Sequence, residues 1–403
     1  MTDLLRDVRY AGRMLRKSLG QTFVAVIALG LGIGLATTAF SIAWGALMRG
    51  LPFPRADRIV HIALADPSHP QNRLDLNPLD FNDWRTRQTS FESLSGYYNG
   101  TINLSGGERP ERFQGAFISA NTFDLLRVRP LLGRGLRAGE DDLRTPLVAV
   151  ISHHLWRTRY GGEAAAVGRP IRVNGQAAII VGIMPAGFAF PYREDVWVPL
   201  RLDSAKLKRG EGQTLEVVGR LKDGVSPAKA QAEMDAVASA LAREYPLTNR
   251  NLVKTRVQSY AAAAIGDQAT GMLWIMVAFG VVVLLIACAN VASLMVARAS
   301  TRTRELAIRS ALGAGRRRVM IQLLLESTLL AVLGAALGLL LASIGVGLFN
   351  AALALNVDNA PPFWIVIAVD RMALAFTLAL TLLSGIACGL LPALQASRAD
   401  VNE

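Results

Sequence analysis

Residues 271–318 decide the fold of this chain. They read GMLWIMVAFGVVVLLIACANVASLMVA at 271–297 and then RASTRTRELAIRSALGAGRRR at 298–318. The first part has no charged residue and exceeds the roughly 20 residues that a helix needs to cross a bilayer. The second part carries seven arginines. An apolar run followed by a short basic segment is typical of a transmembrane helix whose basic end faces the cytoplasm.

Three other stretches of the chain are long and apolar enough to span a membrane. The first lies near the N-terminus, and its apolar part of about 27 residues is too long for the usual ~7–15-residue core of a signal peptide, which favours an uncleaved helix. We therefore expect four transmembrane helices, at 21–49, 271–297, 319–349 and 372–391.

The orientation of these helices follows from the distribution of lysine and arginine, which accumulate on the cytoplasmic side. The loop 350–370 has no basic residue, whereas the segments before the first span and between the second and third spans are rich in them. Residues 1–20 also place apolar side chains at helical spacing, typical of an amphipathic segment on the inner membrane surface or of a simple basic flank. We predict cytoplasmic termini, a cytoplasmic loop 298–318 and a periplasmic segment 50–268.

Composition excludes an ordinary soluble protein. The chain is 52% hydrophobic, its mean hydropathy is +0.32 and its formal net charge is +12. Because the basic residues lie beside the apolar runs, they indicate topology and not nucleic-acid binding. Cys288 and Cys388 both fall within predicted spans, so the outer segment must fold without a disulfide.

The sequence carries none of the common catalytic motifs. The chain contains no G-x-x-x-x-G-K-[ST], G-x-S-x-G or H-E-x-x-H pattern, and its four histidines have no metal-ligand spacing around them. We expect no enzyme activity, no cofactor, no metal and no ATP hydrolysis by this chain itself.

The outer segment has the alternating signals of an α+β domain. β-branched or alternating runs predict strands at 58–64, 175–182, 196–198, 215–222 and 253–258, the fourth half-buried. Helices are expected within 78–98, anchored by Phe81, Trp84 and Phe91, and from Ser226-Pro227 onward. Strand–helix–strand at both ends of the segment predicts that residues 120–212 are an inserted subdomain.

Small and polar residues within the spans predict where helices pack. Gly30 and Gly34, and likewise Gly334 and Gly338, are four residues apart, a spacing that lets helix backbones approach closely in lipid, although glycine is also simply common there. Asn290 is polar at membrane depth, and we expect its amide to bond a neighbouring helix.

The inner loop 298–318 predicts a short amphipathic helix. Helical numbering brings Arg302, Glu305 and Arg309 to one side, whereas Ala307, Ile308, Ala311 and Leu312 form an apolar stripe and Gly313 ends the helix. Such a helix either docks on a cytoplasmic partner or lies against lipid headgroups. The residues alone leave both interpretations open.

The same loop resembles the FtsX-like permease family, whose loop reads roughly R-x-R-E-I-x-x-R-x-x-x-G-A. The matching segments are RTRELAIRSALGA at 302–314, LLLES at 323–327 and GLLPALQASR at 389–398, and IRVNGQAAIIVGIMP at 171–185 resembles a MacB-like periplasmic core domain. RMLRKS at 13–18, LPFP at 51–54 and DVWVPL at 195–200 resemble the duplicated orphan permeases, which are about twice as long. MacB itself carries a fused ATPase, which this sequence lacks.

The resemblance implies an ABC-type permease of the inner membrane that transmits movements of a separate ATPase to its outer domain. It implies a homodimer, with a periplasmic adaptor or envelope partner, and it makes Arg304, Glu305 and Arg309 the best candidates for the ATPase-facing surface. The alternative is a non-transporting regulatory or scaffold protein that activates a periplasmic partner, and a membrane-tethered enzyme is a weaker third.

Overall fold

The fold is seen in a computed structural model of the chain. It describes residues 11–16, 18–69, 72–105, 110–202, 206–300, 316–355 and 361–398. The chain divides into two compact units. The membrane unit comprises residues 1–49, 268–360 and 366–403, and the outer unit comprises residues 50–267 together with residues 361–365.

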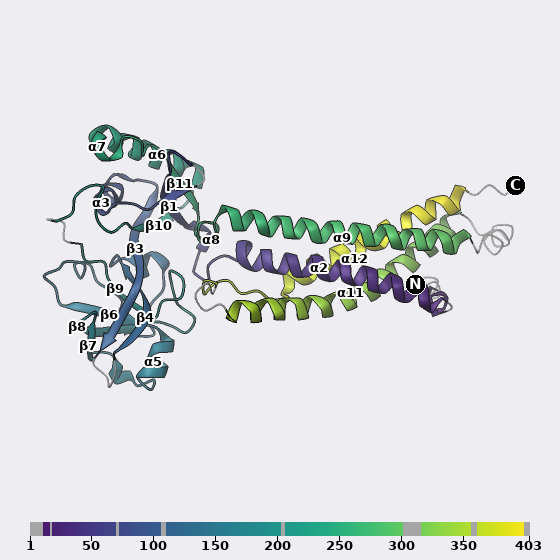
Figure 1. The fold of residues 1–403 in the computed structure, drawn as a ribbon, viewed down its shortest axis with the longest axis horizontal. Helices are drawn as coiled ribbons and strands as arrows, with labels where there is room; N and C mark the ends of the chain where they lie inside the picture. Colours follow the sequence, from purple (N-terminus) through teal and green to yellow (C-terminus); the bar gives the residue numbers. More distant parts are fainter. Residues whose placement is uncertain are drawn as a thin grey trace. The chain divides into compact units, whose positions relative to one another are not determined.

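Four long apolar helices build the membrane unit, and each is long enough to cross a bilayer, as predicted. They are α2 (Leu19–Ala43), which continues as the π-helical turn η1 (Trp44–Met48), α9 (Asp267–Ser300), α11 (Arg316–Leu355) and α12 (Arg371–Arg398) (Figure 1). Apolar side chains dominate their shared core, which includes Leu29, Ile33, Leu284, Val291 and Leu330. Outward-facing side chains are also apolar, as expected of helices that meet lipid.

One mixed sheet organises the outer unit. Its strand order is β11-β1-β10-β3-β4-β9-β6-β8-β5, with β2 paired to β1 and β7 paired to β3 and β8. The strands are β1 (Ile59–Ala65), β2 (Arg73–Leu74), β3 (Phe91–Ser105), β4 (Glu111–Ile118), β5 (Leu132–Gly133), β6 (Leu147–Ile151), β7 (Pro170–Val173), β8 (Gln176–Ile183), β9 (Val196–Pro199), β10 (Glu216–Leu221) and β11 (Thr255–Ser259).

Short helices cover this sheet and connect its strands. They are η2 (Ala56–Arg58), α3 (Pro78–Arg87), α4 (Thr122–Leu126), α5 (His153–Arg159), η3 (Ala164–Ala166), α6 (Pro227–Glu244), α7 (Pro246–Asn249) and α8 (Tyr260–Ile265). Helix α6 begins where Ser226-Pro227 predicted, because the Ser226 side chain accepts a hydrogen bond from the Lys229 backbone N–H. α3 and α6 pack on one face of β1, β3 and β10, and this core includes Trp84, Val217 and Met234.

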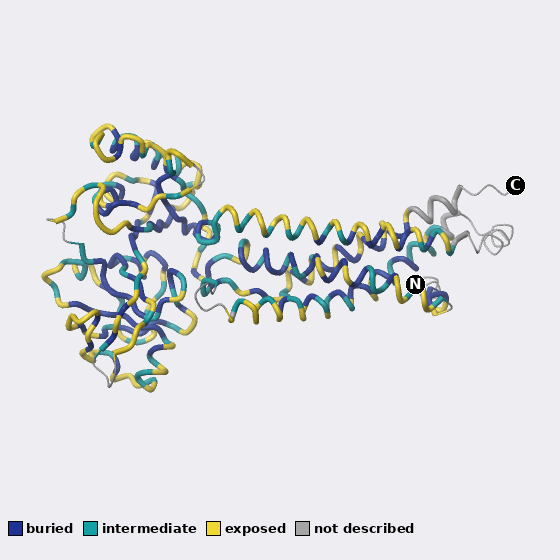
Figure 2. Tube along the Cα trace, viewed as in Figure 1, coloured by how far each residue is buried: buried dark blue, intermediate teal, exposed yellow. Residues whose placement is uncertain are grey.

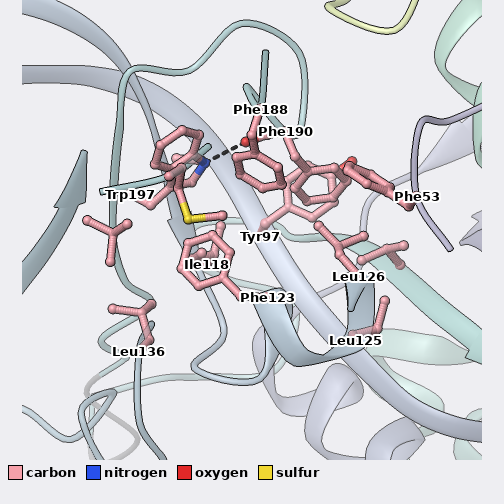
Figure 3. Close-up of a cluster of buried hydrophobic side chains, with 14 of the residues drawn as sticks. Phe53, Tyr97, Ile118, Phe123, Leu125, Leu126, Leu136, Phe188, Phe190 and Trp197 are labelled. Carbon is pink, nitrogen blue, oxygen red and sulfur yellow. Dashed lines mark hydrogen bonds between the residues drawn. The ribbon is translucent and has the colours of Figure 1, made fainter. Parts of the chain in front are cut away.

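The opposite face holds a second core, rich in aromatic side chains. Phe188 and Trp197 lie 5.2 Å apart between ring centroids, and Phe123 packs against both (Figure 3). The Trp197 indole N–H donates to the Phe190 carbonyl, which ties β9 to the loop that precedes it.

One strand prediction and one helix prediction need correction. The prediction of a half-buried strand at 215–222 was wrong, because Val218 and Arg220 are as buried as Val217. β10 lies between β1 and β3 in the sheet, and both of its faces are covered by core. The helix expected within 78–98 ends at Arg87, so Phe91 is not a helical anchor but opens β3.

The predicted insertion, residues 120–212, supplies β5 to β9. These strands form one end of the same sheet, from β9 to β5, where they share a core of their own around Ile151, Leu155 and Ile180. β1, β10, β11 and α6 form the other end. The segment is therefore continuous with the main sheet through the parallel pairing of β4 with β9.

Candidate functional site

The predicted coupling helix lies outside the described residues. Arg302, Arg304, Glu305, Arg309 and Gly313 all fall within 301–315, which the structure does not describe. The structure does describe the start of this loop, at the end of α9. Arg298, near the end of α9, donates from Nε to Gln21 Oε1 and from Nη2 to Thr22 Oγ1 at 3.3 Å. These bonds join the start of the loop to the first turn of α2.

The four predicted packing glycines meet at one interface, between α2 and α11. A Cβ at Gly34 would lie 3.0 Å from the Gly338 carbonyl oxygen, and a Cβ at Gly338 would lie 3.0 Å from the Gly34 nitrogen. A Cβ at Gly30 or Gly334 would meet the facing helix at 2.8 Å or less. The two backbones approach too closely for larger side chains, which is the arrangement that small-residue spacing permits in lipid.

Hydroxyl groups join the spans elsewhere. Thr37 on α2 and Thr377 on α12 share a buried hydrogen bond of 3.0 Å, and Ser327 on α11 donates to the Gly385 carbonyl of α12 at 2.7 Å. Asn290, in contrast, does not pack between helices as expected. Its side chain is exposed on α9 in this single chain.

A strap, residues 361–365, lies in the connection between α11 and α12 and was not predicted from the sequence. These five residues belong to the outer unit although the chain on both sides belongs to the membrane unit. The Phe363 backbone N–H donates to the Tyr192 carbonyl at 2.9 Å, and Arg193 Nε donates to the Pro361 carbonyl at 2.6 Å. The strap is therefore bonded to the turn that precedes β9.

Trp364 anchors the strap in the aromatic core. Its side chain is only 3% exposed, and its ring centroid lies 5.5 Å from that of Tyr260 and 6.2 Å from that of Tyr192. The neighbouring Phe363 contacts Phe188 and Phe53, with centroids 6.2 and 6.0 Å away. Burial on this scale makes the strap part of the folded outer unit, not a surface loop.

A buried polar cluster lies beside these rings. Glu216 Oε2 accepts hydrogen bonds from the hydroxyls of Tyr97 at 3.0 Å and Tyr192 at 3.3 Å, and His61 Nε2 lies 3.5 Å from it. The Tyr97 and Tyr260 hydroxyls are 2.9 Å apart. Burial by itself would raise the pKa of Glu216, but His61 and the tyrosine hydroxyls outweigh it, so this pKa is lowered.

The turn that holds the strap contains a second buried carboxyl group. Glu194 Oε2 accepts the backbone N–H groups of Tyr192 at 2.7 Å and Arg193 at 2.9 Å. Burial raises the pKa of Glu194 to about 7, against the opposing effect of these bonds. The Glu194 carboxyl group thus joins two consecutive backbone N–H groups of the turn that holds the strap.

Among the described residues, no three histidine, cysteine, aspartate or glutamate side chains are grouped to hold a metal ion.

The sequence signal for the strap is the PPFW motif at 361–364, in which two prolines precede two large aromatic residues inside a connecting loop. Its partners lie about 100 or more residues away, which local patterns do not reveal.

Four candidate spans and a mixed α/β domain between the first and second of them define a multi-span membrane protein with one large domain outside its spans. Two family models match: the MacB-like periplasmic core domain over residues 22–237 and the FtsX-like permease C-terminal domain over residues 277–401. The chain belongs to this family of MacB-like and FtsX-like permeases.

Curated relatives are similar to most of this chain. The macrolide export ATP-binding/permease protein MacB of Burkholderia thailandensis is 27% identical over 86% of this chain and 48% of its own length. MacB of Campylobacter jejuni is 25% identical over 68% of this chain and 42% of its own length. The chain thus spans about half the length of the curated relatives it matches.

Among solved structures, the periplasmic region of MacB from Actinobacillus actinomycetemcomitans matches with a TM-score of 0.38 and 13% identity, covering 51% of this chain and 90% of that one. The extracellular domain of the noncanonic ABC-type transporter YknZ from Gram-positive bacteria matches with a TM-score of 0.36 and 11% identity, covering 50% of this chain and 99% of that one.

Proposed function

We propose that this chain is the permease subunit of an ABC-type transporter that transmits the movements of a separate ATPase to its outer domain. The observation that carries this proposal is the strap. Because residues 361–365 fold with the outer unit, the chain passes between the two units at 49–50, 267–268, 360–361 and 365–366. A shift of α11 and α12 relative to α2 and α9 would therefore pull directly on the core of the outer domain.

The contacts on the membrane side of the strap support the same function. Asn350 Nδ2 donates to the Ile367 carbonyl at 2.9 Å, and Arg49 Nη1 donates to the Val366 carbonyl at 3.3 Å. The segment that follows the strap is thus bonded to α11 and to the end of the first span. A connection that is bonded on both sides transmits displacement better than a free loop does.

At the cytoplasmic end, the movement would enter through the loop 298–318. In this proposal Arg302, Arg304, Glu305 and Arg309 face the ATPase, which binds the ATP, and Gly313 ends the coupling helix. The hydrogen bonds of Arg298 to α2 would carry displacement of the loop into the first span. Two copies of the chain would assemble around two ATPase subunits and handle an exported or envelope substrate, with a periplasmic adaptor.

The test compares Glu305→Lys with Arg317→Glu, since both reverse a charge in or next to the loop. Loss of a desolvated charge pair at a docking surface typically costs about 2–5 kcal/mol, whereas an exposed i, i+4 pair contributes only about 0.2–0.5 kcal/mol. We expect both variants to insert normally and only Glu305→Lys to lose the ATPase on purification from native membranes. Equal retention by both variants would contradict the docking role of this loop.

The orientation in this proposal has its own test. We expect reporter domains that are active only outside the cytoplasm to give signal when fused after residue 150, and none when fused after residue 310 or 400. Signal at 310 would overturn the assignment of the inner loop to the cytoplasm, and coupling to an ATPase with it.

A further inference from the structure

Helix α9 is the least buried of the four spans. Only 22% of its most apolar window is buried, against 39–50% in the other three. One face fills the core of the membrane unit through Leu284, Cys288, Val291 and Met295. Exposed positions recur along the opposite side of the helix, as the colouring of Figure 2 shows. This face carries Met272, Ile275, Phe279, Val282, Ile286, Ala289, Asn290, Ser293 and Ala297.

Asn290 is the unusual member of this exposed face. It precedes Arg298 by eight residues, which at a rise of 1.5 Å per residue is about 12 Å along the helix. Arg298 marks the basic end of the span, so the amide lies within the hydrocarbon region. An amide that meets only lipid tails has no hydrogen-bond partner, and this costs free energy. Within the described chain, no hydrogen bond from this side chain compensates that cost.

The residues around Asn290 allow another helix to approach. Ala289, Ser293 and Ala297 are exposed at intervals of four residues. The Ser293 hydroxyl donates to the Ala289 carbonyl at 2.9 Å, so it is folded against its own helix. Three small side chains therefore form a row beside the Asn290 amide. Because small side chains let helix backbones approach closely, such a row favours association of helices in a membrane.

We propose that this face of α9 is a twofold seam between two copies of this chain, with the two Asn290 amides hydrogen-bonded across it. The chemistry of the amide selects this partner. A carboxamide carries both donors and an acceptor, so it can pair with its own twofold mate, and a twofold interface presents the same patch on both subunits. Lipid tails offer neither group. This inference rests on the dimer in the proposed function and assigns a surface to it.

The first test measures dimerisation of the full-length chain in liposomes, without any ATPase, by energy transfer between labelled copies over a lipid dilution series. Interhelical hydrogen bonds in membranes are worth about 0.6–2 kcal/mol, so Asn290→Leu is expected to weaken the dimer about 3- to 30-fold. Asn290→Gln, which keeps donor and acceptor, should retain most of the affinity. The control is Ser343→Leu, which also replaces an exposed polar residue, on α11. An unchanged dimer constant in Asn290→Leu would overturn the amide pairing.

The second test maps the seam by cross-linking in a Cys288→Ala, Cys388→Ala background. Ser293→Cys and Ser343→Cys are matched, because both serines are exposed and both hydroxyls are bonded within their own helix. Oxidation by copper phenanthroline should join two chains at position 293 and not at position 343. Dimers without a cross-link at 293 would overturn the seam and leave the proposed function intact. A chain that is monomeric at every dilution would overturn both.

Discussion

Replacing Trp364 by alanine should release the strap without unfolding the outer domain. A buried aromatic side chain removes about 150–250 Å² from water, which at about 25 cal/mol per Å² corresponds to an upper estimate of about 4–6 kcal/mol. Aromatic-to-alanine changes in cores cost about 3–5 kcal/mol. Ordering each strap residue costs about 1–2 kcal/mol of backbone entropy. The folded conformation of these five residues therefore depends heavily on burial of the Trp364 side chain.

Hydrogen exchange of the full chain gives the readout, because the Phe363 amide is bonded to the Tyr192 carbonyl. A loss of about 3–5 kcal/mol should raise exchange of the strap amides by roughly 100-fold to 1,000-fold or more. Trp274→Ala is the control, since that tryptophan is 47% exposed on α9. Unchanged exchange at Phe363 would refute the anchoring role of Trp364. Faster exchange throughout the sheet would refute the idea that the strap opens locally.

Three further outcomes follow from the structure. Gly338→Ala should lower the melting temperature, because its Cβ would meet α2 at 3.0 Å, whereas Gly347→Ala, with open space around it, should raise stability by up to about 1 kcal/mol. Between about pH 4.5 and 7 the folded chain binds more protons at Glu194 than the unfolded chain does. The stability that this group contributes is therefore present at low pH and is lost as pH rises through about 7. Glu194→Gln should make the melting temperature depend less on pH between pH 5 and 8. The Gln231 side chain is hydrogen-bonded to the backbone of β11 at the edge of the sheet. Gln231→Ala should therefore lower the free energy of unfolding by about 1–3 kcal/mol. It should also speed hydrogen exchange of the Val257 amide, which donates to Gln231 Oε1 at 2.7 Å in the native chain.

Features encoded over short distances were predictable from the sequence. The spans follow from apolar runs of sufficient length, and α6 follows from an N-cap serine, a proline and an apolar stripe. β1 and β8 follow from runs of β-branched residues. In each case the signal and the structure occupy the same residues.

Features that depend on distant parts of the chain were not predictable in this way. Phe91 joins β3 because that strand pairs with β10 and β4, and Arg220 is buried because core covers both faces of β10. The strap needs Tyr192 and Tyr260, which are about 170 and 100 residues away from it. The sequence of residues 361–365 alone does not predict that these rings pack against Trp364.

In the proposed mechanism, movement at the cytoplasmic loop reaches the core of the outer domain through the strap. The most direct test is hydrogen exchange of residues 361–365 in the full chain bound to its ATPase, in the nucleotide-free state and in the ATP-trapped state. We expect exchange of the Phe363 amide to differ between the two states in the native chain, and the difference to disappear in Glu305→Lys. Identical exchange in both states, with the ATPase bound and hydrolysing ATP, would contradict coupling through the strap.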